Sequence, residues 1–379
     1  MSPIKIRTNA TLAGIEDLLA RKPADGSAEV WLPRKLSPAF FIHSHISALI
    51  TTLGLSSRLC VKHWDVRPSV SKAGLIDLLS RDLLHATATM VSERVGTASR
   101  FSELQPSARM RGPLVKKVTE QLGLIDVDEG RSYTICAFDP DAPSPLVLPD
   151  LANAIAFKRA IVDLRRQWLE VGSASQYSKH IALLPPTVES NLATFIYELF
   201  LNSQQHGTLN DDNQPIPGLR FISYRKHVAN SAAALRSRAS GFPELEQYLD
   251  STYRSAGPQF FYEISIGDQG LGIVRRFLAT RSEYSAENSD ARMELLNAII
   301  DKSLSSKVGQ FGAGLGLRRA LEAVGRLNGF LMLRTDDLWT FWSTHVGGHA
   351  MSRVSCKNNP ETIRGTYINL LFPTDIGVG

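Results

Sequence analysis

Three short motifs in the second half of the chain most constrain what this sequence can fold into. A helical pattern carries the first motif, a strand pattern ends in the second, and a helical pattern begins directly after the third. A further strand pattern, GTYINLLFP, follows near the carboxy terminus. Helical and strand periods that alternate in this way predict an α/β fold.

The first motif is an acid and an amide four residues apart, within the segment TVESNLATFIYELFLNSQQHG. Glu198, Asn202 and His206 have the spacing that puts side chains on one side of a helix, beside an apolar face. The amide oxygen of Asn202 can complete a Mg²⁺ coordination shell, and Glu198 can orient or deprotonate a nucleophile. Taken alone, the same spacing is more typical of a solvated helix face.

The second motif is Asp268-Gln269-Gly270-Leu271-Gly272, at the end of an apolar run whose alternation predicts a half-buried strand. A carboxylate at the end of a strand can accept a hydrogen bond from an adenine amino group. The two glycines would let the backbone approach the ring closely. The simpler alternative is a strand followed by a tight turn, where glycine after aspartate is common.

The third motif is the glycine series Gly312, Gly314 and Gly316, which opens the helical pattern RRALEAVGRL. Glycines before a helix expose backbone amides and the positive end of the helix dipole, which suits phosphate. A flexible turn into a helix would show the same residues. The series is not a Walker A loop, since no Gly-Lys-Ser/Thr follows, and SSKVGQF upstream is a poor strand for a dinucleotide fingerprint.

In this order, the motifs resemble the asparagine box and the two glycine boxes of the GHKL ATPases, the Bergerat-fold family of gyrase, heat-shock chaperones, histidine kinases and MutL. The resemblance covers about residues 180 to 373. It implies a carboxy-terminal α/β sandwich of the Bergerat type, with a mixed sheet covered by helices. It also implies ATP and Mg²⁺ as cofactors.

The resemblance assigns a role to each matching position. Asn202 would hold Mg²⁺, Glu198 would be the catalytic base, and Asp268 would bind adenine in a pocket shaped by the two glycines of its motif. Residues 273 to 311 would form a mobile lid. The other implied nucleotide-binding residues are His206, Gly270, Gly272, Lys307, Gly312, Gly314, Gly316 and Thr366. For Lys307, a solvated surface lysine is the alternative reading.

The family contains both protein kinases and ATPases, and His206-Gly207 resembles the kinase and anti-sigma branch. None of the nine histidines precedes Asp or Glu, so the usual phosphoacceptor of a sensor kinase is missing from the sequence. We therefore hypothesise a regulatory protein that hydrolyses ATP or transfers its terminal phosphate to a protein partner. The alternatives are a non-enzymatic, ATP-responsive interaction module and a MutL-like ATPase associated with nucleic acid. A homodimer stays open.

The first half predicts a separate α/β domain over residues 1–175, followed by the ATP-binding domain over 176–379. Glu29 to Leu32 and Leu59 to Trp64 have strand patterns, and a helical pattern capped at Ser37-Pro38 lies between them. This unit loosely resembles STAS-like domains and predicts a regulatory or partner-binding role. Further along, a buried strand is expected from Tyr133 to Phe138 and a helix from Leu151 to Val171. Asp139 and Asp141, in the turn-rich stretch between those two, are expected in a solvated turn.

Composition excludes several classes of protein. No run approaches the ~20 apolar residues of a membrane helix, and the amino terminus lacks an apolar signal core, which predicts a cytoplasmic protein without a membrane partner. The three cysteines are far apart, so they predict reduced thiols rather than disulfides or a zinc site. The net charge of +5 is weak evidence for nucleic acid. The pair Arg318-Arg319 predicts a solvated helix face.

Overall fold

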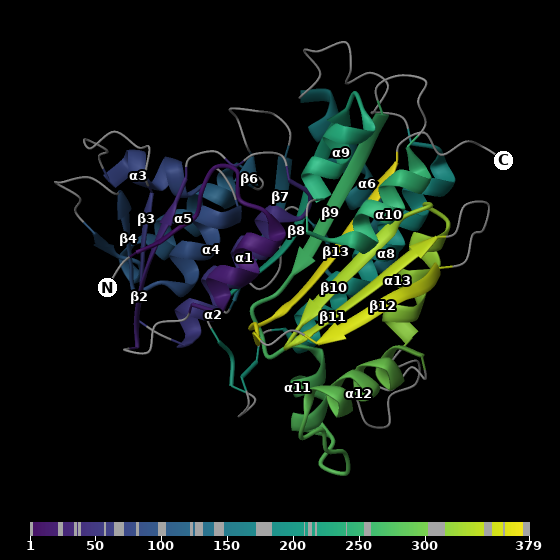
Figure 1. The fold of residues 1–379 in the computed structure, drawn as a ribbon. Helices are drawn as coiled ribbons and strands as arrows, with labels where there is room; N and C mark the ends of the chain where they lie inside the picture. The colour runs from purple at the N-terminus through teal and green to yellow at the C-terminus, as the bar shows by residue number, and fades with distance from the viewer. Residues whose placement is uncertain are drawn as a thin grey trace.

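The computed structural model of the chain describes most of the sequence as two β-sheets with helices around them (Figure 1). The described residues are 3–21, 26–33, 36, 39–56, 58–63, 72–80, 83–97, 104–121, 124–125, 132–139, 148–171, 184–207, 209–210, 214–216, 218–239, 241–253, 259–301, 315–344, 351–358 and 361–373. The fold class expected from the alternating patterns is confirmed: the molecule is α/β.

The amino-terminal sheet has the order β1-β2-β3-β4-β5, in which the first four strands are parallel and the last is antiparallel. Its strands are β1 (Ile4–Lys5), β2 (Ser27–Leu32), β3 (Arg58–His63), β4 (Arg94–Thr97) and β5 (Gln105–Pro106). Its helices are α1 (Leu12–Leu19), α2 (Ile42–Ser56), α3 (Lys72–Leu79), α4 (Leu83–Val91) and α5 (Ala108–Glu120). The predicted strand-helix-strand unit is therefore β2-α2-β3, while the expected cap Ser37-Pro38 lies outside the described residues.

The second sheet has the order β12-β11-β10-β13-β9-β8-β7-β6. Its strands are β6 (Leu124–Ile125), β7 (Ser132–Asp139), β8 (Gly218–Ala229), β9 (Gln259–Gly267), β10 (Phe330–Thr335), β11 (Leu338–Thr344), β12 (Met351–Asn358) and β13 (Thr366–Pro373). Every described pair of neighbours in it is antiparallel, whereas the resemblance implied mixed directions. Short connections such as that between β10 and β11 favour this antiparallel pairing, because a tight turn can join only antiparallel neighbours.

Helices contributed by the second half complete the layers. They are α6 (Ala154–Val171), α8 (Pro186–His206), α9 (Ala232–Ala239), α10 (Pro243–Thr252), α11 (Ile273–Thr280), α12 (Ser289–Asp301) and α13 (Leu315–Gly325). The expected helix after Leu151 corresponds to α6, and the expected strand from Tyr133 corresponds to β7. No helix among the described segments combines the length and apolar character of a membrane span.

Both faces of the second sheet are buried, by different parts of the chain. On one face, Ile264 and Ile266 of β9 pack in a cluster with α6, α8, α12 and α13. On the other face, Phe261 of β9 belongs to a cluster with the amino-terminal helices and with α9 and α10. Figure 1 shows the purple and blue amino-terminal elements on one side of this sheet and α8 and α13 on the other. Strand β9, expected to be half-buried, is therefore buried on both faces.

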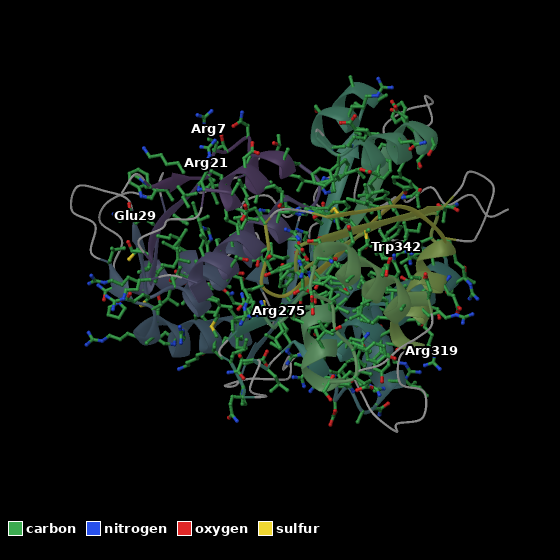
Figure 2. All side chains as sticks on the ribbon, turned by 60° about the horizontal axis from the view of Figure 1, so that its bottom comes forward. Arg7, Arg21, Glu29, Arg275, Arg319 and Trp342 are labelled. Carbon is green, nitrogen blue, oxygen red and sulfur yellow. The ribbon has the colours of Figure 1, made fainter. Side chains whose placement is uncertain are left out.

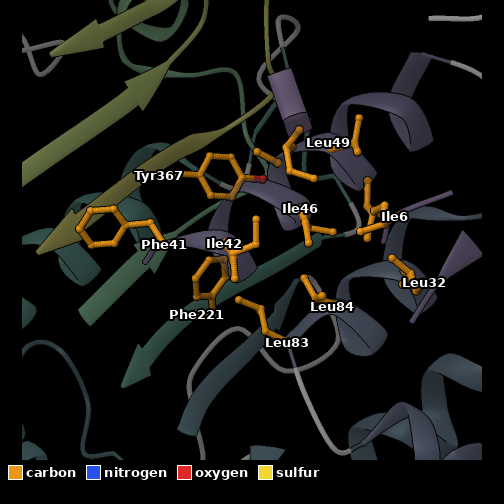
Figure 3. Close-up of a cluster of buried hydrophobic side chains, with 14 of the residues drawn as sticks. Ile6, Leu32, Phe41, Ile42, Ile46, Leu49, Leu83, Leu84, Phe221 and Tyr367 are labelled. Atoms are coloured by element: carbon orange, nitrogen blue, oxygen red, sulfur yellow. The ribbon is translucent and has the colours of Figure 1, made fainter. Parts of the chain in front are cut away.

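This arrangement changes the expected domain organisation. The boundary was predicted near residue 175, but the second sheet already begins with β6, and β7 pairs with β8 from Ser132 to Asp139. The two halves also share one hydrophobic cluster, in which Ile46 and Leu49 of α2 pack with Phe221 and Tyr367 of the second sheet (Figure 3). The amino-terminal elements therefore complete the core of the second sheet rather than enclosing a separate one.

Asp139, expected in a solvated turn, is instead buried at the end of β7. Its carboxylate accepts two hydrogen bonds from the guanidinium of Arg220 on β8, at 2.8 and 3.1 Å. The Arg220 side chain is fully buried and also lies 5.3 Å over the ring of Phe200. The expectation failed because the partner lies 81 residues away in sequence. Asp141 lies outside the described residues.

We expect Asp139→Ala to destabilise the protein by about 3–5 kcal/mol, because the change removes the carboxylate that pairs with a buried guanidinium charge. Asp250→Ala is the matched control, since Asp250 pairs with Arg236 at the exposed surface and such pairs contribute about 1 kcal/mol or less. Chemical denaturation of both variants measures the difference. Equal losses of stability would show that the buried pair has no special role.

Candidate functional site

Helix α8 carries the acid and the amide of the first motif. It begins with proline in its first turn, where the missing N–H costs no helical bond, and it ends at Gly207. Phe195, Ile196 and Leu199 form the buried apolar face of the helix. Burial of this face sets the direction in which the polar side chains of α8 point. Glu198 is 8% exposed and Asn202 is half-buried, so neither lies on the solvated face that the spacing alone suggested.

The first turn of α13 lies directly against this polar stripe. A Cβ atom added at Gly316 would fall 3.2 Å from Glu198 Oε2, 3.2 Å from Asn202 Nδ2 and 3.4 Å from Asn202 Oδ1. Glycine at position 316 therefore lets the first turn of α13 pack closely against the carboxylate and the amide. The structure thus brings the first motif together with the described end of the third.

Arg319, three residues after Gly316, also faces α8. Its Nη1 lies 3.4 Å from Glu198 Oε1, while the neighbouring Arg318 pairs with Glu322 on its own helix. Figure 2 shows Arg319 on the outer side of the molecule, and its side chain is 58% exposed. The prediction of a solvated helix face is therefore confirmed for Arg318, but it did not include the contact of Arg319 with Glu198. The spacing of three residues from Gly316 was the available signal.

Asp268 follows the last residue of β9 and is almost completely buried. Its Oδ1 accepts hydrogen bonds from the N–H groups of Gly270, at 3.0 Å, and Thr366, at 3.3 Å. No hydrogen bond joins Oδ2 to any residue that the structure describes. Burial raises the pKa of the Asp268 carboxyl to about 7, although both backbone donors lower it.

Two glycines let other backbone segments reach this carboxyl group. A Cβ at Gly207 would lie 2.5 Å from Cβ and Cγ of Asp268, and one at Gly270 would lie 2.7 Å from the Cα of Gly207. Real Cβ atoms do not approach other atoms so closely, so both positions require glycine in this arrangement. The end of α8 and the second motif are therefore in direct contact.

The segment before β13 closes the same site from another side. Gly365 has φ +90°, a conformation that favours glycine, and a Cβ there would lie 2.0 Å from the carbonyl oxygen of Asp268. The Asp268 N–H donates to the carbonyl oxygen of Thr366 at 3.0 Å. Thr366, predicted to support the adenine contact, thus holds the Asp268 segment through its backbone.

Gly272 lies apart from this cluster, at the start of α11. It has φ +96°, and a Cβ there would meet Thr335 Oγ1 at 2.8 Å and Asp336 Oδ2 at 2.9 Å. The Ile273 N–H donates to Thr335 Oγ1, which satisfies one of the free donors at the helix start. The observed contacts of Gly272 are thus with the turn between β10 and β11.

The donor set around α8 fits a magnesium nucleotide better than a metal held by protein alone. The described residues contain no group of three or more His, Cys, Asp or Glu side chains that could hold a metal ion. The Asn202 amide oxygen and the Glu198 carboxylate are hard ligands of the type Mg²⁺ prefers, and Mg²⁺ commonly takes its remaining ligands from water and phosphate.

Several predicted site residues cannot be placed. Lys307, Gly312 and Gly314 lie outside the described residues, as does the side chain of His206, whose backbone ends α8. The proposed lid is described from Ile273 to Asp301, where it forms α11 and α12.

Comparisons of the chain with family models, with curated proteins and with solved structures found no match.

We expect Gly207→Ala to destabilise the protein by about 1–3 kcal/mol, because the added methyl group overlaps Asp268 and has no room to relax. The backbone at Gly207 has φ −91°, which alanine adopts without strain, so the steric overlap alone is tested. Gly14→Ala in α1 is the control, since only the Thr11 Oγ1, at 3.3 Å, lies near its added methyl. Urea denaturation should show little loss for the control.

The raised pKa of Asp268 predicts a pH-dependent stability. Between the ordinary carboxyl pKa and about 7, the folded chain holds a proton that the unfolded chain has lost, so stability falls as pH rises through that window. We expect the free energy of unfolding to decrease more steeply from pH 5 to pH 7 in the native chain than in Asp268→Asn. Parallel pH profiles for the two proteins would contradict the assignment.

Proposed function

We propose that the protein binds Mg-ATP between α8, α13 and the Asp268 segment, and that it uses the nucleotide to regulate a protein partner. One observation carries this proposal: the first motif, the second motif and Gly316, the described end of the third, meet around α8. Glu198 and Asn202 on this helix face Gly316, and Gly207 at its end touches Asp268. The resemblance to the GHKL ATPases assigns Glu198, Asn202, Asp268 and Gly316 to one nucleotide site.

The adenine end of the site would be formed by Asp268. Its Oδ2 has no hydrogen bond to a described residue, so it can accept one from the adenine amino group. Gly207 and Gly270 let the end of α8 and the second motif pack tightly beside the carboxyl group, which supports a fixed position for Asp268. The backbone donors to Oδ1 fix the direction of the carboxyl group.

The phosphate end would lie at Asn202, Glu198 and the start of α13. The amino-terminal end of a helix carries partial positive charge, which favours a phosphate group there. Arg319, whose side chain is 58% exposed, adds a positive charge beside the same turn. When bound, Mg²⁺ neutralises charge on the phosphates, and Asn202 would supply one of its protein ligands.

Glu198 would act as the general base of the reaction. Its carboxylate would accept the proton of a water molecule or of a partner hydroxyl as the new oxygen–phosphorus bond forms and ADP leaves. Water as nucleophile gives hydrolysis, and a hydroxyl gives phosphate transfer to the partner. Donors held in fixed positions around the phosphates would provide most of the rate enhancement.

The ion pair between Glu198 and Arg319 favours one alternative, a module that binds ATP without turning it over. In the described arrangement, Glu198 Oε1 lies 3.4 Å from the Arg319 guanidinium, so this oxygen already has a partner other than a nucleophile. Such a module would signal through the bound nucleotide alone. Turnover measured with and without protein partners separates the two functions.

We expect Glu198→Gln to bind Mg-ATP within about twofold of the native affinity and to lose 10²–10⁴-fold in turnover, the range typical of a general base. Glu322→Gln is the matched control, because Glu322 is an exposed acid on α13 that pairs with Arg318 and lies outside the motifs. Phosphate release and calorimetric titration measure both properties. Native turnover in Glu198→Gln would exclude this residue as the base, and binding without turnover in the native chain would favour the non-enzymatic module.

A further inference from the structure

We propose that helix α2 of the amino-terminal unit positions the nucleotide site, through the hydroxyl groups of Thr51 and Thr52. The inference rests on the proposed function for its effect on ATP. Each hydroxyl bonds one of the two chain segments that surround Asp268. The state of the amino-terminal unit would thereby set the geometry of the adenine-binding carboxyl group.

Thr51 reaches the second motif through Gln269, the residue after Asp268. Gln269 is 1% exposed, and its Nε2 donates to Thr51 Oγ1 at 3.1 Å. Its Oε1 accepts from the N–H of Leu219, at the start of β8, at 2.8 Å. The side chain of Gln269 therefore fixes its own segment between α2 and β8.

Thr52 reaches the segment before β13. Its Oγ1 accepts a hydrogen bond from the N–H of Arg364 at 3.0 Å. The next two residues, Gly365 and Thr366, are those that contact the backbone of Asp268 and donate to its carboxylate. A displacement of α2 at Thr52 would act on the Asp268 carboxyl group through three consecutive residues, 364 to 366.

The helix that carries these hydroxyls is firmly packed. Figure 3 shows Ile42, Ile46 and Leu49 of α2 in the shared hydrophobic cluster, with Tyr367 reaching from β13 towards the helix. Thr51 is fully buried and Thr52 is 3% exposed, so neither hydroxyl is at the surface. Because packed cores deform little, movement of α2 would be transmitted to the loops rather than absorbed.

This route differs from the lid expected from the sequence. That lid would be formed by residues 273 to 311. The hydrogen bonds of Thr51 and Thr52 connect the two parts at the adenine end of the site, independently of that segment. By linkage, any signal on the amino-terminal unit that shifts α2 changes ATP affinity, and ATP changes the affinity for that signal by the same factor.

The test compares Thr51→Val, which removes the hydroxyl at nearly constant volume, with Thr51→Ser, which keeps it. Thr89→Val is the control, because Thr89 is equally buried and, among the residues that the structure describes, its hydroxyl bonds only to the carbonyl of His85 within α4. Amide hydrogen exchange of the nucleotide-free proteins reports the order of residues 268–270 and 364–366. Calorimetric titration with Mg-ATP reports affinity.

We expect faster exchange in residues 268–270 for Thr51→Val, near-native exchange for Thr51→Ser and Thr89→Val, and about tenfold weaker Mg-ATP binding for Thr51→Val alone. Unchanged exchange and unchanged affinity in Thr51→Val would overturn the positioning role. A loss of affinity that serine fails to restore, or that Thr89→Val shares, would also overturn it. A native chain that binds no Mg-ATP would overturn the proposed function. In that case, hydrogen exchange alone would still test whether Thr51 holds the Asp268 segment in place.

Discussion

Burial of the second sheet on both faces is the constraint on which the rest of the structure depends. An antiparallel sheet can leave one face to water, but here α8 and α13 cover one face and the amino-terminal helices cover the other. Strand β9, near the middle of this sheet, leads directly to Asp268. The candidate site therefore stands at the end of a rigid strand and in contact with both halves of the chain.

Burial also explains the chemistry available at the site. A carboxyl group taken out of water is costly in its charged form, which is why its pKa is raised and why backbone donors are needed to hold it. Gly207, Gly270 and Gly365 allow the chain segments around Asp268 to pack this closely, because a side chain at any of these positions would overlap its neighbours. A surface aspartate would need none of these features.

The sequence predicted the local elements well and the non-local contacts poorly. Periodicity located α8, β7, β9 and β13, because each has a strong apolar pattern of its own. It could not predict the pairing of Asp139 with Arg220 or of Gln269 with Thr51, since these partners are 81 and 218 residues apart. Strand pairing is also a non-local contact, so the sequence placed the domain boundary near residue 175 although β6 and β7 belong to the second sheet.

Nucleotide selectivity tests the central claim most directly, namely that Asp268 recognises adenine. Adenine presents an amino donor where guanine presents a carbonyl oxygen. Above pH about 7, where the Asp268 carboxyl group is ionised, it should accept a hydrogen bond from the first and repel the second. Calorimetric titration of the native chain and of Asp268→Asn with Mg-ATP and Mg-GTP measures this preference. The account predicts that the native chain binds Mg-ATP, that it binds Mg-GTP at least about tenfold more weakly, and that Asp268→Asn loses the preference. Equal binding of both nucleotides, or no binding of either by the native chain, would contradict it.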